Sequence, residues 1–521
     1  MIDPPRLPTP GSPKSRPCHH RRAEDRARSR LRVTWDSGSP RLGPALALAL
    51  LAAAIAIVSA CSGAPRATSS PPRRPAESRA EVAFLDSLER RTFHYFWDLS
   101  DSAIGLTPDR WPTRSFASVG AVGFALTAYP IGAERGYVGR ARAAERTRNT
   151  LRFFWTARQD TAASGTTGYR GFFYHFLDPV SGARFERVEL SSMDTALLLA
   201  GALFCQSYFD RRDPVEAEIR SLADSIYRRA DWNWLQVRPP SIALGWKPEG
   251  GHLPYDWRGL NETLILHVLA LGSPTHAVGP ATWSEYVSRY RWGTFHGQSH
   301  VGFAPLFGHQ YSHVWIDFRG IRDRAMREKG IDYFENSRRA TLAQREYGIA
   351  NPSRYVGYDA TFWGWTACDG PLDRTLTIDG RERAFHTYWA RGASFTEVND
   401  DGTVAPTAAA GSIAFAPEMV TRTLLEMRRR YGANVYGRFG FVDALNPTLA
   451  EAVPVHHGKV VPGVGWFDTD WLGIDEGPIV AMIENHRSGL VWNTMKKNPY
   501  VVSGLRRAGF TGGWLDVRDP R

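Results

Sequence analysis

Apolar side chains recur with helical spacing along most of the chain after residue 84. In "FLDSLERRTFHYFWDLS" (84–100), Phe84, Leu88, Phe96 and Leu99 lie on one face of a predicted helix. The same periodicity predicts helices over 118–133, 138–158, 192–209, 214–233, 262–271, 283–290, 321–347, 412–431, 475–487 and 500–508. Helices therefore make up most of the expected regular structure.

One segment departs from the helical pattern. "GFFYHFLDPVSGARFERVEL" (171–190) has two aromatic-rich arms around a turn that contains Asp178, Pro179 and Gly182, which is typical of a β-hairpin. The segments 357–373 and 461–474 are rich in Gly and Trp and are expected to be loops. No strands alternate with the helices, which argues against a doubly wound sheet or a β/α barrel. We expect an all-α fold, either a toroid of helical hairpins with a cleft at one end or an irregular bundle.

The pattern of the first 80 residues predicts an export signal. An Arg-rich leader precedes the uncharged segment Leu42–Ala60, and "VSAC" ends at Cys61, where small residues are followed by a thiol. This resembles a bacterial lipobox, which implies cleavage before Cys61 and lipidation of that residue. The alternative is a single membrane-spanning helix, for which 19 residues would suffice. We expect a signal peptide with an overlong leader over 1–60, a disordered Pro/Ser/Arg-rich tether over 61–81, and one catalytic domain over 82–521.

Most of the net charge of +11 belongs to that leader. Residues 1–80 hold 14 Lys and Arg against 5 Asp and Glu, so residues 81–521 hold 50 against 48. A nearly neutral folded part with no basic stripe argues against a nucleic-acid partner. Cys205 and Cys368 are the cysteines left in that part, and we expect two isolated buried thiols rather than a disulfide.

Tryptophan is unusually frequent, with 17 of the 18 residues after position 90. A large aromatic core and a cleft that stacks on sugar rings explain this about equally well. Phosphate-binding and serine-hydrolase motifs are absent from the sequence. His309, His313 and Asp317 are spaced four apart, as metal ligands on a helix can be, but no third His or Cys is near. A polar cleft wall is the preferred interpretation, and no metal is expected.

Carboxylates lie in aromatic or Gly-rich settings throughout the domain. Hydrolysis of a glycosidic bond needs two carboxyl groups across the bond, one protonated and one ionised. The candidates are Asp194, Asp256, Glu262, Asp317, Asp323, Asp369, Asp468, Asp470, Asp475 and Glu476. Several also have a structural explanation, so the pattern alone singles out none of them.

Four structural explanations are specific. Ser191-x-x-Asp194 is a capping box, Asp475 could cap a helix near Pro478, and Asp369 could fix a turn before Gly370. Glu262 follows Asn261, a plausible N-cap, where the helix dipole favours a negative charge. That dipole would lower the pKa of Glu262, whereas a general acid needs it raised, so burial against Tyr255, Trp257 and Leu264 would have to dominate.

Long ordered blocks across residues 84–510 resemble the glucoamylase-like domain that includes glycoside hydrolase family 144, the bacterial endo-β-1,2-glucanases. The blocks are "SVGAVGFALTAYPIGAERG" (118–136), "ELSSMDTALLLAGALF" (189–204), "YDWRGLNETLILHVLALGSPTH" (255–276), "FGHQYSHVWIDFRGIRD" (307–323), "TACDGP" (366–371), "DDGTVAPTAAAGSIAFAPE" (400–418) and "GWFDTDWLGIDEGPIVAMIENHRSGLVW" (465–492).

The resemblance implies an (α/α)6 toroid and an inverting hydrolase that acts on β-1,2-linked glucose chains without a metal or other cofactor. It implies that Glu262 is the acid and that Asp194 and Asp475 line the catalytic centre, with the base unassigned between them. The expected substrate-binding residues are Asp256, Trp257, His309, His313, Asp317, Trp363, Asp369, Trp466, Asp468, Asp470 and Trp471. Trp365 and Cys368 depart from the expected pattern, which leaves the preferred chain length open.

Three functions remain possible at this point. The first is an exported glucanase held by a lipid anchor on the periplasmic side of a membrane, expected to be the outer membrane, and either endo-acting or sophorose-releasing. The second is a non-catalytic surface lipoprotein that binds glycans through the same cleft. The third is another carbohydrate-active enzyme on this scaffold, such as a polysaccharide lyase. The sequence does not determine the oligomeric state.

Overall fold

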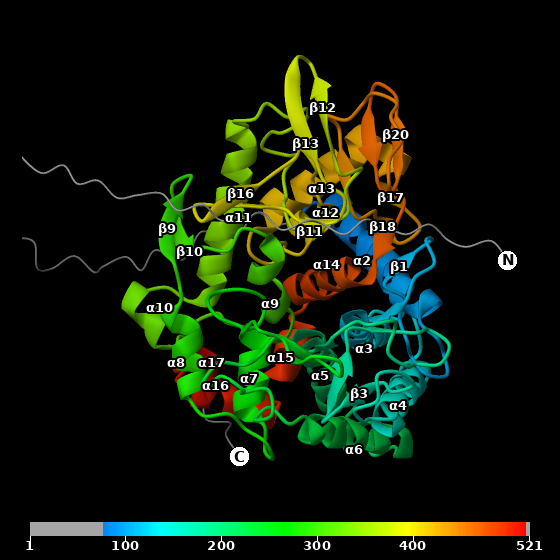
Figure 1. Ribbon diagram of the computed structural model, residues 1–521, viewed down its shortest axis with the longest axis vertical. Helices are drawn as coiled ribbons and strands as arrows, with labels where there is room; N and C mark the ends of the chain where they lie inside the picture. The colour runs from blue at the N-terminus through cyan, green and yellow to red at the C-terminus, as the bar shows by residue number, and fades with distance from the viewer. Residues whose placement is uncertain (1–76, 517–521) are drawn as a thin grey trace, which may run out of the picture. The chain divides into compact units, whose positions relative to one another are not determined.

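The computed structural model describes residues 77–516, which form one compact unit within the segment 76–521. The predicted signal peptide, Cys61 and nearly all of the predicted tether lie outside the described residues. Helices dominate this unit, as the periodicity predicts, and many short strands join them (Figure 1).

The helices have the following bounds: α2 Arg79–Leu99, α3 Val119–Glu134, α4 Arg140–Thr156, α5 Ser192–Tyr208, α6 Pro214–Arg229, α7 Leu264–Gly272, α8 Ala281–Ser288, α9 Tyr311–Trp315, α10 Arg324–Lys329, α11 Tyr333–Ala350, α12 Pro406–Ala410, α13 Pro417–Tyr431, α14 Gly473–Arg487, α15 Leu490–Met495, α16 Pro499–Arg507 and α17 Gly513–Asp516, with 3₁₀ turns η1 at Leu306–His309 and η2 at Gly432–Asn434.

Two kinds of helix alternate along the chain. Helices α3, α5, α7, α12 and α14 are buried around nearly their whole circumference. Helices α4, α6 and α13 bury one stripe and expose the other, as in α4, where Ala143, Thr147, Leu151 and Phe154 share the buried face. In Figure 1, α14 crosses the middle of the unit, with α3 and α5 below it and α12 and α13 above it.

Glycine allows the buried helices α3 and α5 to approach backbone to backbone. A Cβ added at Gly123 of α3 would lie 2.3 Å from the carbonyl oxygen of Leu197. A Cβ added at Gly201 of α5 would lie 2.2 Å from the carbonyl oxygen of Gly123. Any side chain at either position would therefore force the two helices apart.

The strands have the following bounds: β1 Arg110–Trp111, β2 Ala117–Ser118, β3 Gly168–Tyr169, β4 Phe172–Tyr174, β5 Phe176–Leu177, β6 Leu190–Ser191, β7 Gly245–Lys247, β8 Gly251–His252, β9 Trp292–Phe295, β10 Gln298–Val301, β11 Ala367–Cys368, β12 Arg374–Ile378, β13 Arg381–Phe385, β14 Trp389–Ala390, β15 Gly392–Ser394, β16 Glu397–Asn399, β17 Tyr436–Gly437, β18 Gly440–Phe441, β19 Leu445–Asn446, β20 Lys459–Val461, β21 Gly465–Phe467 and β22 Trp471–Leu472.

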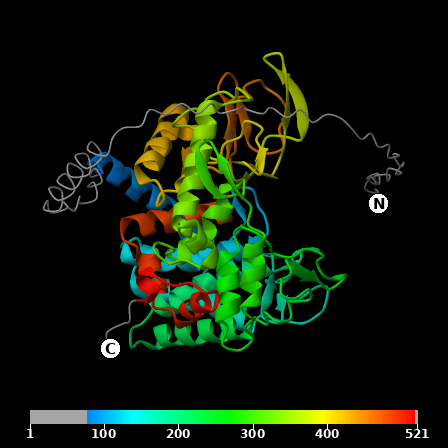
Figure 2. The same cartoon turned by 90° about the vertical axis from the view of Figure 1, so that its left-hand side faces the viewer.

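The predicted hairpin over 171–190 is present, but it is not the isolated insertion we expected. Its arms pair antiparallel, Phe173 with Ser191 and Tyr174 with Leu190, and belong to a sheet of order β3-β4-β6-β7-β8. Further two-stranded hairpins were not predicted, among them β9–β10 and β12–β13, which protrudes at the top of Figures 1 and 2. The description all-α is therefore too simple, although the fold is mainly helical.

Two of the predicted helical runs end or begin elsewhere than expected because of a single residue. The run 321–347 is two helices, because Gly330 adopts φ 70° and ends α10 before Asp332 caps α11. The run 412–431 starts later than predicted, at Pro417, which occupies the first turn of α13. Each difference depends on a single Gly or Pro residue, which leaves the periodicity of the apolar residues unchanged.

Candidate active site

A cleft opens where several buried helices begin. Its volume is about 260 Å³, and it is lined by His175, Glu189, Ser191, Met193, Asp194, Leu197, Leu244, Leu253, Trp257, Glu262, Phe307, Tyr311, Ala367, Tyr388, Ile474 and Asp475. Asp194 lies in the first turn of α5 and Asp475 in the first turn of α14. Glu262 lies in the turn just before α7. The cleft thus brings together the three carboxyl groups predicted to be catalytic.

Short strands deliver these helix starts to the cleft. Strand β6 runs directly into α5 through the N-cap Ser191, and β22 runs into α14 through Leu472. Pairing with β4 and β7 on either side holds β6, while β1 holds β22. The carboxyl groups are therefore fixed by backbone hydrogen bonds outside the helices as well as by the helices themselves.

Glu262 has the raised pKa that a general acid requires. It is half-buried, and burial raises the pKa of its carboxyl group to about 7, with a further increase from the nearby charge of Asp194. A hydrogen bond from its own backbone N–H lowers this pKa, as we expected near a helix start, but the effect of burial is larger. Trp257 shares the cleft with Glu262, whereas Tyr255 is exposed and contributes no burial there.

The expected capping roles are partly wrong. Helix α7 begins two residues later than predicted, at Leu264, with Thr263 at the N-cap, and Asn261 Oδ1 accepts hydrogen bonds from the backbone and hydroxyl of Thr263. Glu262 therefore precedes the helix. Asp475 does not cap α14 either, because that helix starts two residues earlier at Gly473.

Donors surround the carboxylate of Asp194. The N-cap Ser191 accepts a 3.1 Å hydrogen bond from the backbone N–H of Asp194, so that half of the predicted capping box is present. The hydroxyl of Ser191 donates to Asp194 Oδ2 at 2.5 Å, and Nε2 of His175 lies 3.5 Å from the same oxygen. Such donors stabilise the ionised form of a carboxyl group.

His175 is a member of the cleft that the sequence did not reveal. Burial alone would lower the pKa of its imidazole, but the carboxylates of Asp194 and Glu189 outweigh burial and raise it to about 9. Its Nδ1 lies 2.9 Å from Glu189 Oε1, and this contact lowers the pKa of Glu189 to about 2. A positive imidazole therefore bridges two negative carboxylates. His175 and Glu189 meet because their backbones pair, with the N–H of His175 donating to the carbonyl oxygen of Glu189.

Asp475 joins the cleft to a second, more deeply buried group of acids. Burial raises the pKa of Asp475 and of Asp443, and the nearby charge of Asp475 adds to the rise at Asp443. Asp369, Asp468 and Asp470 lie beside Asp443, with Arg110 paired to Asp369 at 2.6 Å. Asp443 was not among the predicted carboxylates, although Gly437 and Gly440 precede it in the sequence.

The remaining predicted binding residues fall into three groups. Trp257 lines the cleft, and its indole N–H donates to Ser192 Oγ at 2.8 Å. Asp369, Asp468, Asp470, Trp466 and Trp471 lie in and around the buried acid group, next to the cleft rather than in its wall. The others lie elsewhere: His309, His313, Asp317, Trp363 and Asp256.

The predicted binding residues that lie away from the cleft contact other groups of the protein instead. His309 and His313 are buried on different elements, η1 and α9, so they do not share the helix face we expected. Asp317 pairs with Arg319 and Lys496, and Asp256 pairs with Arg238. The indole of buried Trp363 donates to Thr423. These placements do not suit direct contact with a substrate in the cleft.

Aromatic side chains that we did not single out form much of the cleft wall. Phe307, Tyr311 and Tyr388 line it together with Trp257. Tyr311 donates a hydrogen bond to the carbonyl oxygen of Ile474, which connects α9 to the start of α14. A wall of this kind can stack on sugar rings, whose faces are partly apolar.

Two further expectations concern cysteines and membranes. Cys205 and Cys368 are both buried and free, which confirms two isolated thiols. No helix within residues 77–516 combines the length and the apolar character needed to cross a membrane.

Comparison with known proteins identifies the class. A family model described as "Putative glucoamylase" matches residues 254–499, which include Glu262 and Asp475. A crystal structure of a Bacteroides uniformis protein with the same description superimposes with a TM-score of 0.71 at 29% identity, covering 85% of this chain and 100% of the other. The chain is thus glucoamylase-like, as its sequence blocks predicted.

Two further relatives are more specific. An endo-β-1,2-glucanase from Chitinophaga pinensis, solved with sophorotriose and glucose, matches with a TM-score of 0.70 at 25% identity over 84% of this chain and 100% of the other. An exo-β-1,2-glucooligosaccharide sophorohydrolase from Parabacteroides distasonis is 27% identical over 457 residues, which is 81% of this chain. The chain spans 57% of the length of that curated relative.

Proposed function

We propose that the protein is a glycoside hydrolase that cleaves β-1,2-linked glucan by an inverting, acid–base mechanism. The observation that carries this proposal is the cleft carboxyl group of Glu262, whose pKa is raised to about 7 and which shares the cleft with the carboxyl group of Asp194. Two carboxyl groups with opposite protonation states are the chemical requirement for hydrolysis of a glycosidic bond. Nothing in this mechanism requires a metal.

In the proposed reaction, the carboxyl of Glu262 donates its proton to the glycosidic oxygen as the bond to the leaving sugar breaks. An ionised carboxylate on the opposite side takes a proton from the attacking water. The leaving chain departs with a new hydroxyl group, and the water oxygen becomes the anomeric hydroxyl with inverted configuration.

Asp194 is the favoured base, and Asp475 is the alternative. The hydroxyl of Ser191 and the imidazolium of His175 stabilise the charged form of Asp194. Burial raises the pKa of Asp475, which disfavours the charged form. In this assignment a protonated Asp475 can donate a hydrogen bond to a sugar hydroxyl.

The proposed substrate class comes from the relatives. One is named an endo-β-1,2-glucanase and another an exo-acting sophorohydrolase. The aromatic wall of Trp257, Tyr311 and Tyr388 is compatible with a glucose chain, and the acids at the cleft can accept hydrogen bonds from its hydroxyls. We also infer that the alternation of buried and amphipathic helices closes into an (α/α)6 toroid.

The test is incubation of the purified protein with linear β-1,2-, β-1,3- and β-1,4-glucans, followed by chromatography of the products. Products from the β-1,2-glucan alone are expected. Sophorose as the only early product would assign exo action, and a ladder of oligosaccharides would assign endo action. Binding of β-1,2-glucan without any turnover would instead favour a glycan-binding protein, and an ultraviolet-absorbing unsaturated product would favour a lyase.

We further propose export and lipid anchoring through Cys61, which lies outside the described residues. The "VSAC" sequence that ends at Cys61 supports this proposal. Membrane fractionation of wild type and of Cys61→Ser in a Gram-negative host tests it. The wild type is expected in the membrane fraction and to carry a lipid mass on Cys61, and the variant is expected to lack both.

A further inference from the structure

Four buried aspartates gather behind the cleft on three separate segments of the chain. Asp369 follows β11, Asp443 lies between β18 and β19, and Asp468 and Asp470 lie between β21 and β22. Each is at most 3% exposed. Among residues 77–516, Arg110 is the only Lys or Arg that pairs with any of them, at 2.6 Å from Asp369 and 3.7 Å from Asp470. One positive charge therefore faces four carboxyl groups.

Each of the four holds one carboxyl oxygen with protein donors and leaves the other without a hydrogen bond, although Asp470 Oδ2 lies 3.7 Å from Arg110. Asp443 Oδ2 accepts from the backbone of Asp369, and Asp468 Oδ1 accepts from the backbone of Asp470. Asp470 Oδ1 accepts from Thr113, and Asp369 Oδ2 accepts from Arg110. The opposite oxygen of each aspartate is buried and has no hydrogen-bond partner within the described part of the chain.

Metal-ligating carboxylates are likewise held by hydrogen bonds from protein groups. One oxygen from each of Asp369, Asp443 and Asp468 lies within 4.8 Å of the others. Oxygen ligands at about 2.3–2.6 Å from a shared Ca²⁺ can lie this close to one another. A buried unpaired acceptor is costly, so three such carboxyl groups close together favour a positive ligand.

We propose that Asp369, Asp443 and Asp468 bind one hard divalent cation, with Ca²⁺ preferred because every ligand atom is a carboxylate oxygen. The ion cross-links the three segments and thereby fixes the loop that runs from β21 through β22 into α14, where Asp475 begins the cleft wall. Its role is structural, so it adds no step to the proposed hydrolysis, and it goes beyond the metal-free expectation from the sequence.

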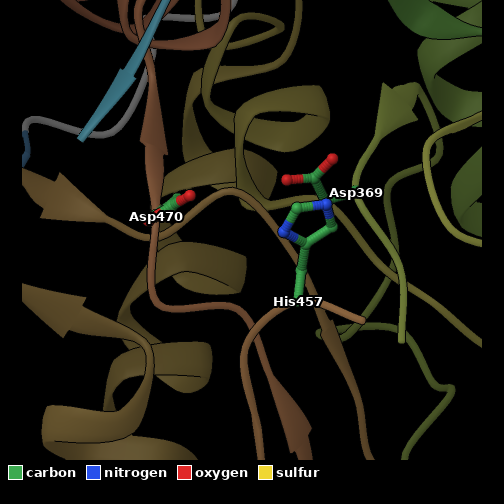
Figure 3. Close-up of side chains that lie close together, drawn as sticks. All are labelled: Asp369, His457 and Asp470. Atoms are coloured by element: carbon green, nitrogen blue, oxygen red, sulfur yellow. The ribbon is translucent and has the colours of Figure 1, made fainter. Parts of the chain in front are cut away.

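A second set of ligands competes with the first. Asp369, His457 and Asp470 also bring one ligand atom each within 4.8 Å, and Figure 3 shows the half-exposed imidazole of His457 beneath the carboxylate of Asp369. An imidazole favours Zn²⁺ over Ca²⁺. The all-oxygen set is preferred because its members are more deeply buried, which makes their unpartnered oxygens more costly without an ion.

The carboxyl group of Asp475 lies near Asp443 and raises its pKa. Protons alone could therefore neutralise part of this group. Neutralisation by protons and neutralisation by a metal ion differ in whether a cation binds, which can be measured directly.

The test uses purified protein treated with a chelator and then titrated by calorimetry with Ca²⁺, Mg²⁺, Mn²⁺ and Zn²⁺. Terbium luminescence excited through the neighbouring Trp466 and Trp471 provides an independent signal. We expect one Ca²⁺ per chain and a higher melting temperature with Ca²⁺. Asp468→Asn and Asp443→Asn are expected to weaken binding by at least about tenfold.

Asp323→Asn is the matched control, because Asp323 is equally buried but both of its oxygens accept hydrogen bonds, from Met326, Trp283 and Tyr333. It should leave Ca²⁺ binding unchanged. Wild-type protein that binds none of the four ions overturns the proposal without reference to any variant. Loss of binding in His457→Ala with full binding in Asp443→Asn also overturns it, in favour of the second set.

Discussion

The imidazole of His175 bridges the carboxylates of Asp194 and Glu189, with Nε2 at 3.5 Å from Asp194 Oδ2 and Nδ1 at 2.9 Å from Glu189 Oε1. Its positive charge favours an ionised Asp194. The charge of Asp194 in turn raises the pKa of Glu262. One histidine thus helps to separate the protonation states of the two carboxyl groups that the proposed reaction requires.

Replacing His175 by Gln should reduce kcat while leaving KM nearly unchanged. Loss of an interaction with a charged group costs about 1.5–3 kcal/mol, which corresponds to about 10- to 150-fold in rate. Steady-state kinetics on β-1,2-glucan measure this. His276→Gln is the control, since His276 pairs with Asp231 on the surface. An unchanged kcat in His175→Gln would remove this residue from the mechanism.

Glu262→Gln should fold normally and lose about 10²- to 10⁴-fold in kcat, the usual contribution of a general acid. Its melting temperature should be equal to or above that of the wild type, because a half-buried carboxyl group becomes neutral. Glu346→Gln, a change on the outer face of α11, serves as the control. Near-normal activity in a folded Glu262→Gln protein would mean that Glu262 has only a structural role.

The pH dependence of kcat/KM should show a decline above about pH 7. Glu262 must be protonated to act as the acid, and its pKa of about 7 means that it loses this proton as the pH rises. A substrate with a good leaving group, such as a nitrophenyl sophoroside, needs little protonation and should show a weaker decline. A profile that is flat up to pH 9 with the natural glucan would contradict the assignment of the acid.

Arg391→Met should destabilise the protein strongly. The guanidinium of Arg391 is fully buried and donates to Asp401 at 2.7 and 2.8 Å and to the carbonyl oxygen of Cys368 at 2.8 Å. Removing it leaves the buried charge of Asp401 unpaired, which costs about 3–5 kcal/mol. Denaturant unfolding measures the change. Arg324→Met should cost less than about 0.5 kcal/mol, because its pair with Glu328 is exposed.

Gly123→Ala should also lower stability, by about 1–3 kcal/mol. The added Cβ would lie 2.3 Å from the backbone of α5, and helices cannot yield locally as a flexible side chain can. Gly279→Ala is the control, because no atom lies within 4 Å of its added Cβ. Equal melting temperatures for the two variants would mean that α3 and α5 can separate without cost.

The sequence predicted the helices well and the strands poorly. A helix with one apolar face repeats it every three or four residues, so α4, α6 and α13 each leave a signal over many residues. A two-residue strand such as β6 or β22 leaves no such signal, because its existence depends on a partner far away in the chain. Those short strands are the elements that deliver Asp194 and Asp475 to the cleft.

By itself the sequence determined the helical periodicity and the free, buried cysteines, and the resemblance of its ordered blocks indicated the glucoamylase-like class and the three carboxyl groups of the cleft. Only the tertiary structure decided that burial prevails over the helix start at Glu262, that His175 lies against Asp194, and that His309 and His313 belong to the core. The reason is physical: a pKa and an unpartnered oxygen depend on what surrounds a group in space, and residues hundreds of positions apart supply those surroundings.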